Sequence, residues 1–162
     1  MDFALTEAQE MIRKEVAALA RGFSLDYWLE KDEKAEYPYE FIKAFGDAGW
    51  LGIMVPEAYG GAGLGVTEAA IMLHEICASG AGTSGASPIH FYVFPPTPVI
   101  RFGTEEQKRR HLPGLCHGET ILAFGVTEPN AGTDTSRIQT RAVKQGDRYV
   151  VNGRKVWTTN AQ

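Results

Sequence analysis

The sequence predicts an α+β protein in which an all-α N-terminal domain is followed by the first strands of a sheet domain. Two observations carry this prediction. Apolar residues recur at helical spacing through the first two-thirds of the 162-residue chain. From Thr120 onward the pattern changes to short β-branched and apolar runs separated by turn signals. The change places a boundary near Gly118, which gives a helical domain at 1–118 and the start of a β-domain at 119–162.

The first two helices are predicted from caps and apolar faces. Thr6 can form a reciprocal capping box with Gln9, and the helix that follows stops near Gly22. A second helix is expected to begin at Pro38, and Gly49 suits the left-handed position after its C-terminus. Both segments carry an apolar side, so both are expected to pack against a core.

Two further helices are predicted by the same signals. Thr67 is a plausible N-cap for a largely buried helix that closes in the small residues 79–82. Thr104 and Gln107 form a second capping box, and the short, exposed helix that they start is expected to end before Pro113.

The last quarter of the chain predicts a β-meander. The expected strands are residues 120–126, 138–144 and 148–152. Turn signals stand at residues 145–147 and at Asn152-Gly153. The sequence stops after the segment through Trp157, which would leave an open sheet edge, and we therefore expect it to be the front part of a longer protein.

Composition excludes several functions. The formal net charge is −4 with acidic and basic residues interspersed, so neither nucleic acid nor a membrane surface is an expected partner. Apolar stretches fall short of the roughly 20 residues of a membrane-spanning helix. No signal or transit peptide is evident, so cytoplasm is the expected location. Cys77 and Cys116 lack metal or redox spacing and are expected to be buried or inert, and no metal site is predicted.

Three motifs have a functional and a structural interpretation, and we favour the structural one. The glycine-rich residues 59–65 lack the spacing of a phosphate-binding loop and predict a turn between helices. Ser84 lacks the second glycine of a nucleophile elbow. His74-Glu75 begins a zinc-protease pattern, but Ala78 stands where the second histidine is required.

Two other features stay open at this level. The aromatic residues 90–98 can line an apolar acyl pocket or pack in the core, and Pro95, Pro96 and Pro98 are expected to break any helix there. Glu128 can serve as a general base, or it can hold its loop by accepting main-chain hydrogen bonds. We favour the loop role for Glu128.

Two motifs near the end of the chain are the most informative. GVTEPNAGTD (residues 125–134) and WTTN (residues 157–160) supply hydroxyl groups, a flat apolar side chain and small residues that admit a ligand to the backbone. With further segments at 5–9, 52–57, 59–61, 102–107 and 152–153, they resemble the acyl-CoA dehydrogenase family in order and spacing. The resemblance covers the chain from its first helix to its last residue.

The resemblance implies an N-terminal helical domain, a middle β-barrel domain and a C-terminal helical bundle, the last being absent from this sequence. It implies FAD as cofactor and assigns site residues by position. The expected flavin contacts are Phe124, Val126, Thr127, Trp157 and Thr159, the last through a hydroxyl near flavin N5. Thr133 is expected to contact the CoA portion of an acyl-CoA substrate.

The implied reaction removes an α-proton as the β-hydrogen leaves as hydride to the flavin, which yields a trans-2-enoyl-CoA. No catalytic residue is assigned, because the resemblance places the base in the C-terminal domain, and the fragment alone is expected to be inactive. Electron-transferring flavoprotein is the implied electron acceptor, and a dimer or tetramer is the implied assembly. Arg137 departs from the small residue usual at its position, and the three prolines are a second departure.

Two rival functions remain. An acyl-CoA oxidase or flavin monooxygenase of the same fold would use O2 in place of a flavoprotein acceptor. A non-catalytic helical interaction module could keep the same fold. Oxygen reactivity distinguishes the first rival, and the presence of a C-terminal bundle with an acidic base distinguishes the second.

Overall fold

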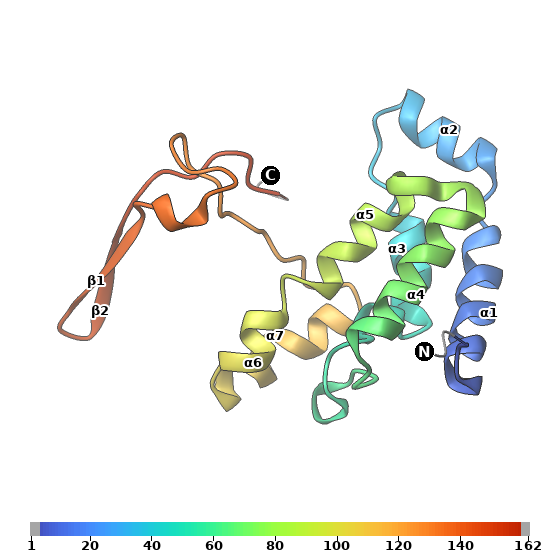
Figure 1. Ribbon diagram of the computed structural model, residues 1–162, viewed down its shortest axis with the longest axis horizontal. Coiled ribbons are helices and arrows are strands. Elements are labelled where there is room, and N and C mark those ends of the chain that lie inside the picture. The colour runs from blue at the N-terminus through green and yellow to red at the C-terminus, as the bar shows by residue number, and fades with distance from the viewer. Residues whose placement is uncertain (1–3, 160–162) are drawn as a thin grey trace. The chain divides into compact units, whose positions relative to one another are not determined.

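The computed structural model describes residues 4–159 and divides the chain into two compact units, Met1–Ile121 and Leu122–Gln162 (Figure 1). The first unit is helical and the second carries the strands, as the sequence predicts. The helices are α1 (Glu7–Arg21), α2 (Leu25–Glu33), α3 (Tyr39–Asp47), α4 (Val66–Ile76), α5 (Gly82–Val93), α6 (Thr97–Phe102) and α7 (Glu105–Cys116).

The two predicted capping boxes are confirmed. Thr6 Oγ1 accepts the Gln9 N–H at 3.2 Å, and Gln9 Oε1 accepts the Thr6 N–H at 3.1 Å. Thr104 and Gln107 repeat the arrangement at the start of α7. In each box two main-chain donors that the first helical turn leaves unpaired gain partners.

The predicted cap at Thr67 is wrong. Helix α4 begins at Val66, and Gly65 occupies the cap position. The Glu68 carboxylate accepts the Gly65 N–H at 3.0 Å, so an acidic side chain in the first turn replaces the capping hydroxyl. The same carboxylate accepts the Gln9 side-chain amide at 2.8 Å and thereby links α4 to α1.

The predicted end of the last helix before Pro113 is also wrong, because α7 continues through Pro113 to Cys116. Leu112 and Leu115 are each 1% exposed. Burial of this apolar turn outweighs the one main-chain hydrogen bond that proline removes.

The left-handed residue expected after α3 is confirmed, since Gly49 has φ +79°.

Three helices had no strong sequence signal. Helix α2 has the N-cap Ser24, which accepts the Tyr27 N–H at 3.3 Å. Helices α5 and α6 are separated at Pro95 and Pro96, as the predicted break requires, whereas Pro98 lies in the first turn of α6, where the missing N–H costs little. Between α4 and α5 the chain makes a π-helical turn, Cys77–Ala81, that bends at Gly80.

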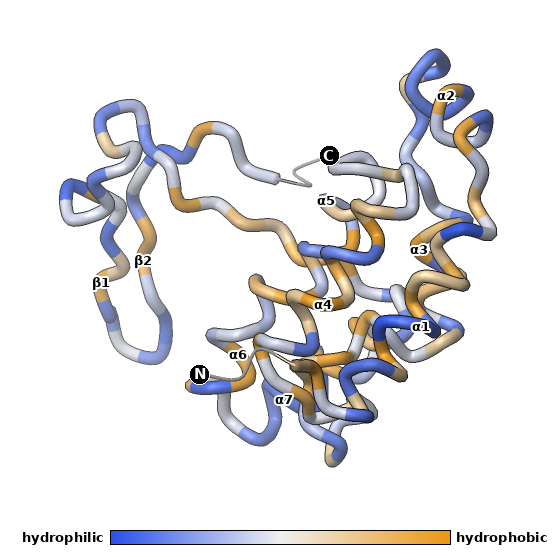
Figure 2. Tube along the Cα trace, turned by 45° about the vertical axis from the view of Figure 1, so that its right-hand side comes forward, coloured by the Kyte–Doolittle hydropathy of each residue, from blue (hydrophilic) through white to orange (hydrophobic). Residues whose placement is uncertain are grey.

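The core of the helical unit lies among α1, α3, α4, α5 and α7. In Figure 2 hydrophobic stretches recur along α3, α4 and α5. Fully buried side chains include Phe41, Phe45, Leu51, Met72 and Ile89. Phe41 and Phe45 have ring centroids 4.6 Å apart, and Trp28 brings α2 to the same cluster at 4.9 Å from Phe41. Aromatic packing therefore fixes α2 on the core.

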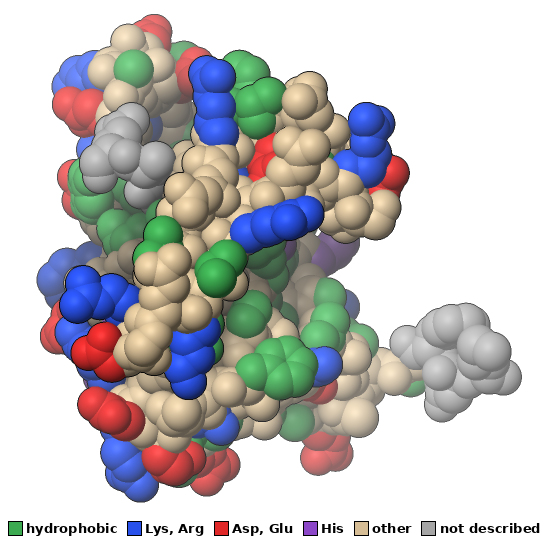
Figure 3. Space-filling model, turned by 90° about the vertical axis from the view of Figure 1, so that its left-hand side faces the viewer, with side chains coloured by type: hydrophobic (Ala, Val, Ile, Leu, Met, Phe, Trp, Pro, Cys, Tyr) green, Lys and Arg blue, Asp and Glu red, His purple; other side chains and the backbone are tan. Residues whose placement is uncertain are grey.

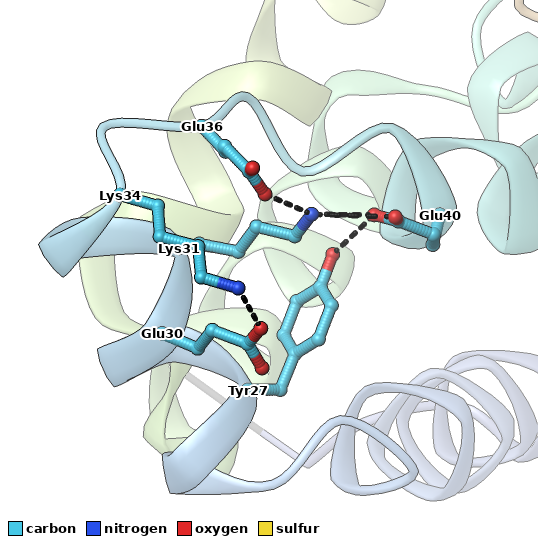
Figure 4. Close-up of polar contacts among 6 residues, drawn as sticks. All are labelled: Tyr27, Glu30, Lys31, Lys34, Glu36 and Glu40. Carbon is cyan, nitrogen blue, oxygen red and sulfur yellow. Dashed lines mark hydrogen bonds and ion pairs between the residues drawn. The ribbon is translucent and has the colours of Figure 1, made fainter.

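A polar cluster reinforces the contact between α2 and α3 (Figure 4). The Lys31 ammonium lies 3.1 Å from Glu36 and 3.2 Å from Glu40, and the Tyr27 hydroxyl donates to Glu40 at 3.1 Å. The cluster pairs the Lys31 ammonium with two carboxylates and lies at the surface, so its role is structural. Across the described residues, no helix combines the length and the apolar character needed to cross a membrane.

Within the described part of the second unit, residues 122–159, the strands β1 (Arg141–Gln145) and β2 (Arg148–Asn152) form an antiparallel hairpin with Val143 opposite Val150. Gly146 makes its turn at φ +64°. The predicted strand at 120–126 is wrong, because only Phe124 forms an isolated bridge. The predicted turn at Asn152-Gly153 is also wrong. Gly153 instead lies against Thr140, where an added Cβ would come within 2.1 Å of Oγ1.

Candidate functional site

Two extended segments of the second unit, residues 124–128 and 155–159, run antiparallel to each other. The Val156 N–H donates to the Thr127 carbonyl at 2.9 Å, and the Thr159 N–H donates to the Phe124 carbonyl at 3.4 Å. Both pairs belong to one register, which also sets Glu128 opposite Lys155. Residues of the two sequence motifs are therefore brought together, although residues 135–156 separate the motifs in the chain.

The pairing between these two hydrogen bonds is irregular. In a regular antiparallel ladder, hydrogen-bonded pairs recur every second residue. Here they are three residues apart, and Trp157, which lies between Val156 and Thr159, has left-handed backbone at φ +58°. A left-handed residue rotates its peptide groups out of the ladder, which accounts for the change of phase.

A tight turn follows the first segment. Glu128 and Ala131 exchange two main-chain hydrogen bonds, at 3.0 and 3.1 Å, around Pro129 and Asn130. Thr133 lies just beyond this turn and is exposed. Asp134 then caps a short 3-10 turn, Thr135–Arg137, by accepting the Ser136 N–H at 3.2 Å. The turn thus holds Thr133 in an accessible loop beside the paired segments.

The Glu128 carboxylate is the polar centre of the unit. It accepts the Gln139 N–H at 2.7 Å, the Thr140 N–H at 2.9 Å and the Thr140 hydroxyl, and the Lys155 ammonium lies 3.0 Å away. The Thr140 hydroxyl bond, the main-chain donors and the Lys155 ammonium lower the pKa of Glu128 to about 2. The hydrogen bonds that Glu128 accepts from the main chain of Gln139 and Thr140 are those that the loop-holding role requires.

The five residues predicted to contact a flavin all lie on the paired segments. Val126, Thr127 and Thr159 are half-buried, whereas Phe124 is 38% exposed and Trp157 is 88% exposed. Thr133 and Arg137 are exposed on the loop that follows the turn. Asn160, the last residue of the second motif, lies outside the described residues.

This arrangement fits a flavin. An isoalloxazine ring requires hydrogen-bond donors at its polar edge and apolar surface against its faces. The threonine hydroxyls at 127 and 159 and the exposed Trp157 indole supply both kinds of contact within one pair of segments. The strained backbone at Trp157 is also of the kind that concentrates at binding sites.

Sequence reasoning missed the residues that support these segments. Lys155 donates to both Glu128 and the Val126 carbonyl, the latter at 2.9 Å. Thr140 bonds to Glu128 and packs against Gly153. These contacts join residues 12 to 29 positions apart, so no local pattern in the sequence could have indicated them.

The other candidate features of the sequence are structural. In the glycine-rich segment, the N–H groups of Ala62, Gly63 and Leu64 donate to carbonyls of residues 52–55, so they are not free for a phosphate. His74 is exposed and contacts Glu75, and among residues 4–159 no group of His, Cys, Asp or Glu could hold a metal. Tyr92 is 3% exposed, which places it in the core.

The two cysteines differ in exposure. Cys116 is buried, and burial raises the pKa of its thiol. Cys77 is exposed, so of the two expected states, buried or inert, burial does not apply to it. Hydrophobic side chains are visible at the surface among charged ones on the face shown in Figure 3.

Two family models match the chain. Residues 6–119 match the acyl-CoA dehydrogenase N-terminal domain, and residues 123–162 match the acyl-CoA dehydrogenase middle domain. The short-chain-specific acyl-CoA dehydrogenase of Clostridium acetobutylicum is 41% identical over 99% of this chain and 42% of its own length. The mitochondrial isovaleryl-CoA dehydrogenase of Bos taurus is 39% identical over 96% of this chain and 37% of its own.

Solved structures give the same result. A structure described as the electron transferring flavoprotein of Acidaminococcus fermentans matches with a TM-score of 0.86 and 39% identity over 100% of this chain and 42% of that one. The FAD complex of PigA matches with a TM-score of 0.90 and 26% identity, over 99% of this chain and 42% of that one. The prolyl acyl carrier protein oxidase AnaB matches with a TM-score of 0.85 and 31% identity, over 97% of this chain and 42% of that one. The chain thus spans about two-fifths of the length of these proteins.

Proposed function

Because the chain belongs to the acyl-CoA dehydrogenase family, we propose that it forms part of an FAD-dependent oxidoreductase that desaturates an acyl-CoA thioester to a trans-2-enoyl-CoA. One observation supports this proposal above the others. The antiparallel pairing of residues 124–128 with 155–159 gathers the hydroxyls and the exposed indole that a flavin requires. Relatives of this family include dehydrogenases and a protein with bound FAD.

In this proposal the two segments hold one side of the flavin. FAD supplies the acceptor for the hydride that leaves the β-carbon. The Thr159 hydroxyl would donate a hydrogen bond near flavin N5, and Thr127 would donate at the pyrimidine side, beside Phe124 and Val126. A donor fixed in advance stabilises charge that arrives during the reaction at little reorganisation cost. The Trp157 indole excludes water from the ring, which strengthens those hydrogen bonds.

The substrate is proposed to reach the same unit through Thr133. This side chain is exposed and follows the small residues Ala131 and Gly132, so a ligand can approach the backbone here. Arg137 stands at the end of the next turn and is exposed. A guanidinium at this position is suited to a phosphate of the CoA portion.

The base that removes the α-proton is proposed to lie in the C-terminal region that the relatives have and this chain does not span. Glu128 does not take that role. Its pKa near 2 and its set of donors make it a poor proton acceptor at neutral pH. We accordingly expect the chain alone to bind FAD weakly and to oxidise no acyl-CoA, because half a site leaves the ring in water.

The proposed electron acceptor is electron-transferring flavoprotein, and the proposed assembly of the whole protein is a dimer or tetramer. The first of these is supported by the similarity to the Acidaminococcus structure. An oxidase is the second candidate, because the similarity to the AnaB oxidase is of comparable strength.

The test uses the whole protein with bound FAD under anaerobic conditions. Short, long and branched acyl-CoA thioesters are added in turn while the flavin absorbance is recorded. Bleaching by at least one thioester is the expected result, and an unbleached flavin across the whole panel contradicts the proposal. Electron-transferring flavoprotein or air is then admitted to the reduced enzyme. Rapid reoxidation by air alone identifies the oxidase.

A further inference from the structure

We propose that Lys155 and Glu128 are positioning residues, which hold the two flavin-contacting segments in one register so that Thr127 and Thr159 face a bound flavin correctly. This inference rests on the proposed function, because that function assigns the flavin to these segments. The pair itself would not touch the flavin. It would act through the main chain of residues 124–127 and 156–159.

The first observation is the place of the pair in the register. Glu128 and Lys155 stand directly opposite each other at one end of the paired segments, with Nζ and Oε1 3.0 Å apart. The Glu128 side chain is 6% exposed and that of Lys155 is 28% exposed. A partly buried charge pair is screened less by salt than a fully exposed surface pair.

The second observation is that Lys155 also serves the main chain. Its ammonium donates to the Val126 carbonyl at 2.9 Å. Val126 is the residue opposite Trp157, where the left-handed backbone interrupts the ladder. The lysine therefore adds a hydrogen bond between the segments within the interrupted part of the ladder, where no main-chain hydrogen bond joins Val126 to Trp157.

The third observation is that the carboxylate which receives Lys155 is itself fixed. The main-chain N–H groups of Gln139 and Thr140 each donate to one of its two oxygens. These two residues directly precede β1. A slip of one residue would set Lys155 opposite Thr127 or Pro129, neither of which carries a charge. The ion pair therefore favours one register over the neighbouring ones. The main-chain hydrogen bonds of an interrupted ladder would not specify the register by themselves.

The experiment compares three variants in the whole protein with bound FAD. Lys155→Met removes the ammonium and keeps most of the aliphatic chain. Lys155→Arg keeps the charge. Arg154→Met is the matched control, because it makes the same change of charge at the neighbouring exposed residue. Amide hydrogen exchange at Val156 and Thr159 reports the pairing itself, and the visible spectrum and reduction rate of the flavin report its consequence.

We expect Lys155→Met to speed exchange at both amides on the order of tenfold, since their local opening becomes easier. We expect the same variant to shift the flavin spectrum and to slow flavin reduction with little change in acyl-CoA affinity. Lys155→Arg should restore all of these measurements, and Arg154→Met should change none of them. Unchanged exchange in Lys155→Met overturns the inference, as does faster exchange with a wild-type flavin spectrum and reduction rate.

A second pair of variants guards against a misfolded Lys155→Met. Gly153→Ala places a Cβ 2.1 Å from the Thr140 hydroxyl oxygen and so displaces a donor to Glu128, whereas the Cβ of Gly132→Ala meets nothing within 4 Å. Faster exchange at Val156 and Thr159 is expected only in Gly153→Ala, and equal exchange in both contradicts the inference. Wild-type protein that retains no FAD contradicts the proposed function instead. In that case the exchange data still show whether Lys155 and Glu128 hold the two segments in one register.

Discussion

Trp157 combines two properties that one residue seldom has, a left-handed backbone at φ +58° and an indole that is 88% exposed. The left-handed conformation costs a non-glycine residue roughly 1–2 kcal/mol. Because the indole is exposed, packing within the chain does not offset this cost. The anchored amides of Val156 and Thr159 on either side keep the conformation in place. A residue held in this way is available to a ligand.

The strain at Trp157 is tested by two substitutions that both remove the indole. Trp157→Gly relieves the left-handed backbone, whereas Trp157→Val places a β-branched residue where it is most disfavoured. We expect the valine variant to be less stable than the glycine variant by about 1–2 kcal/mol. Chemical denaturation measures the difference, and equal stabilities would show that the position is unstrained.

Glu128 makes the stability of its unit depend on acid. Its pKa is lowered from 4.5 to about 2, so the folded form binds a proton less readily than the unfolded form. The stabilisation is therefore fully present above about pH 4.5 and is lost as the pH falls toward 2. We expect the gap in unfolding free energy between the wild type and Glu128→Gln to shrink over that range. A gap that stays constant between pH 6 and pH 2.5 would contradict the hydrogen-bonded carboxylate.

At the scale of the elements, helix starts follow from local chemistry and sheet boundaries do not. The capping boxes at Thr6 and Thr104 need only residues three apart, so spacing alone identified them. The end of α7 was missed because burial of Leu112 and Leu115 decides it, and burial is a tertiary property. Residues 120–126 have β-forming composition, but only Phe124 finds a bridging partner.

The same distinction applies to the site. The motifs at 125–134 and 157–160 placed the candidate flavin contacts on segments that the structure pairs. The register between those segments, and the support from Lys155 and Thr140, depend on contacts between distant parts of the chain. A left-handed tryptophan also has no sequence signal, because the conformation is disfavoured for that residue type.

The corrected helix start offers a direct comparison. Thr6→Ala and Thr104→Ala each remove a capping hydroxyl and are expected to lower the free energy of unfolding by about 1 kcal/mol. Thr67→Ala is the matched control, since Thr67 lies inside the first turn of α4 and is exposed. Its expected effect is within about 0.5 kcal/mol. If Thr67→Ala lowered the free energy of unfolding as much as Thr6→Ala, Thr67 would be the N-cap of α4, as the sequence predicted.

At the scale of the whole molecule, charge divides between the two units. Leu122–Gln162 holds six Lys and Arg residues against three acidic ones, a formal +3, whereas Met1–Ile121 holds ten against seventeen, a formal −7. The cationic unit is the one that carries the proposed flavin and CoA contacts. Its charge suits the phosphates of both molecules.

In the proposed enzyme, one pair of segments serves the flavin while the neighbouring loop serves the substrate. Rapid-mixing reduction of the flavin by an acyl-CoA, with the dissociation constant measured alongside, tests it in the whole protein. Thr159→Val is predicted to slow reduction, by up to about 3 kcal/mol in the barrier, more than it weakens binding. Thr133→Ala is predicted to weaken acyl-CoA binding by about 1 kcal/mol and to leave the flavin spectrum intact. Wild-type reduction in Thr159→Val, or loss of flavin with unchanged acyl-CoA affinity in Thr133→Ala, would contradict this division of roles between the segments and the loop.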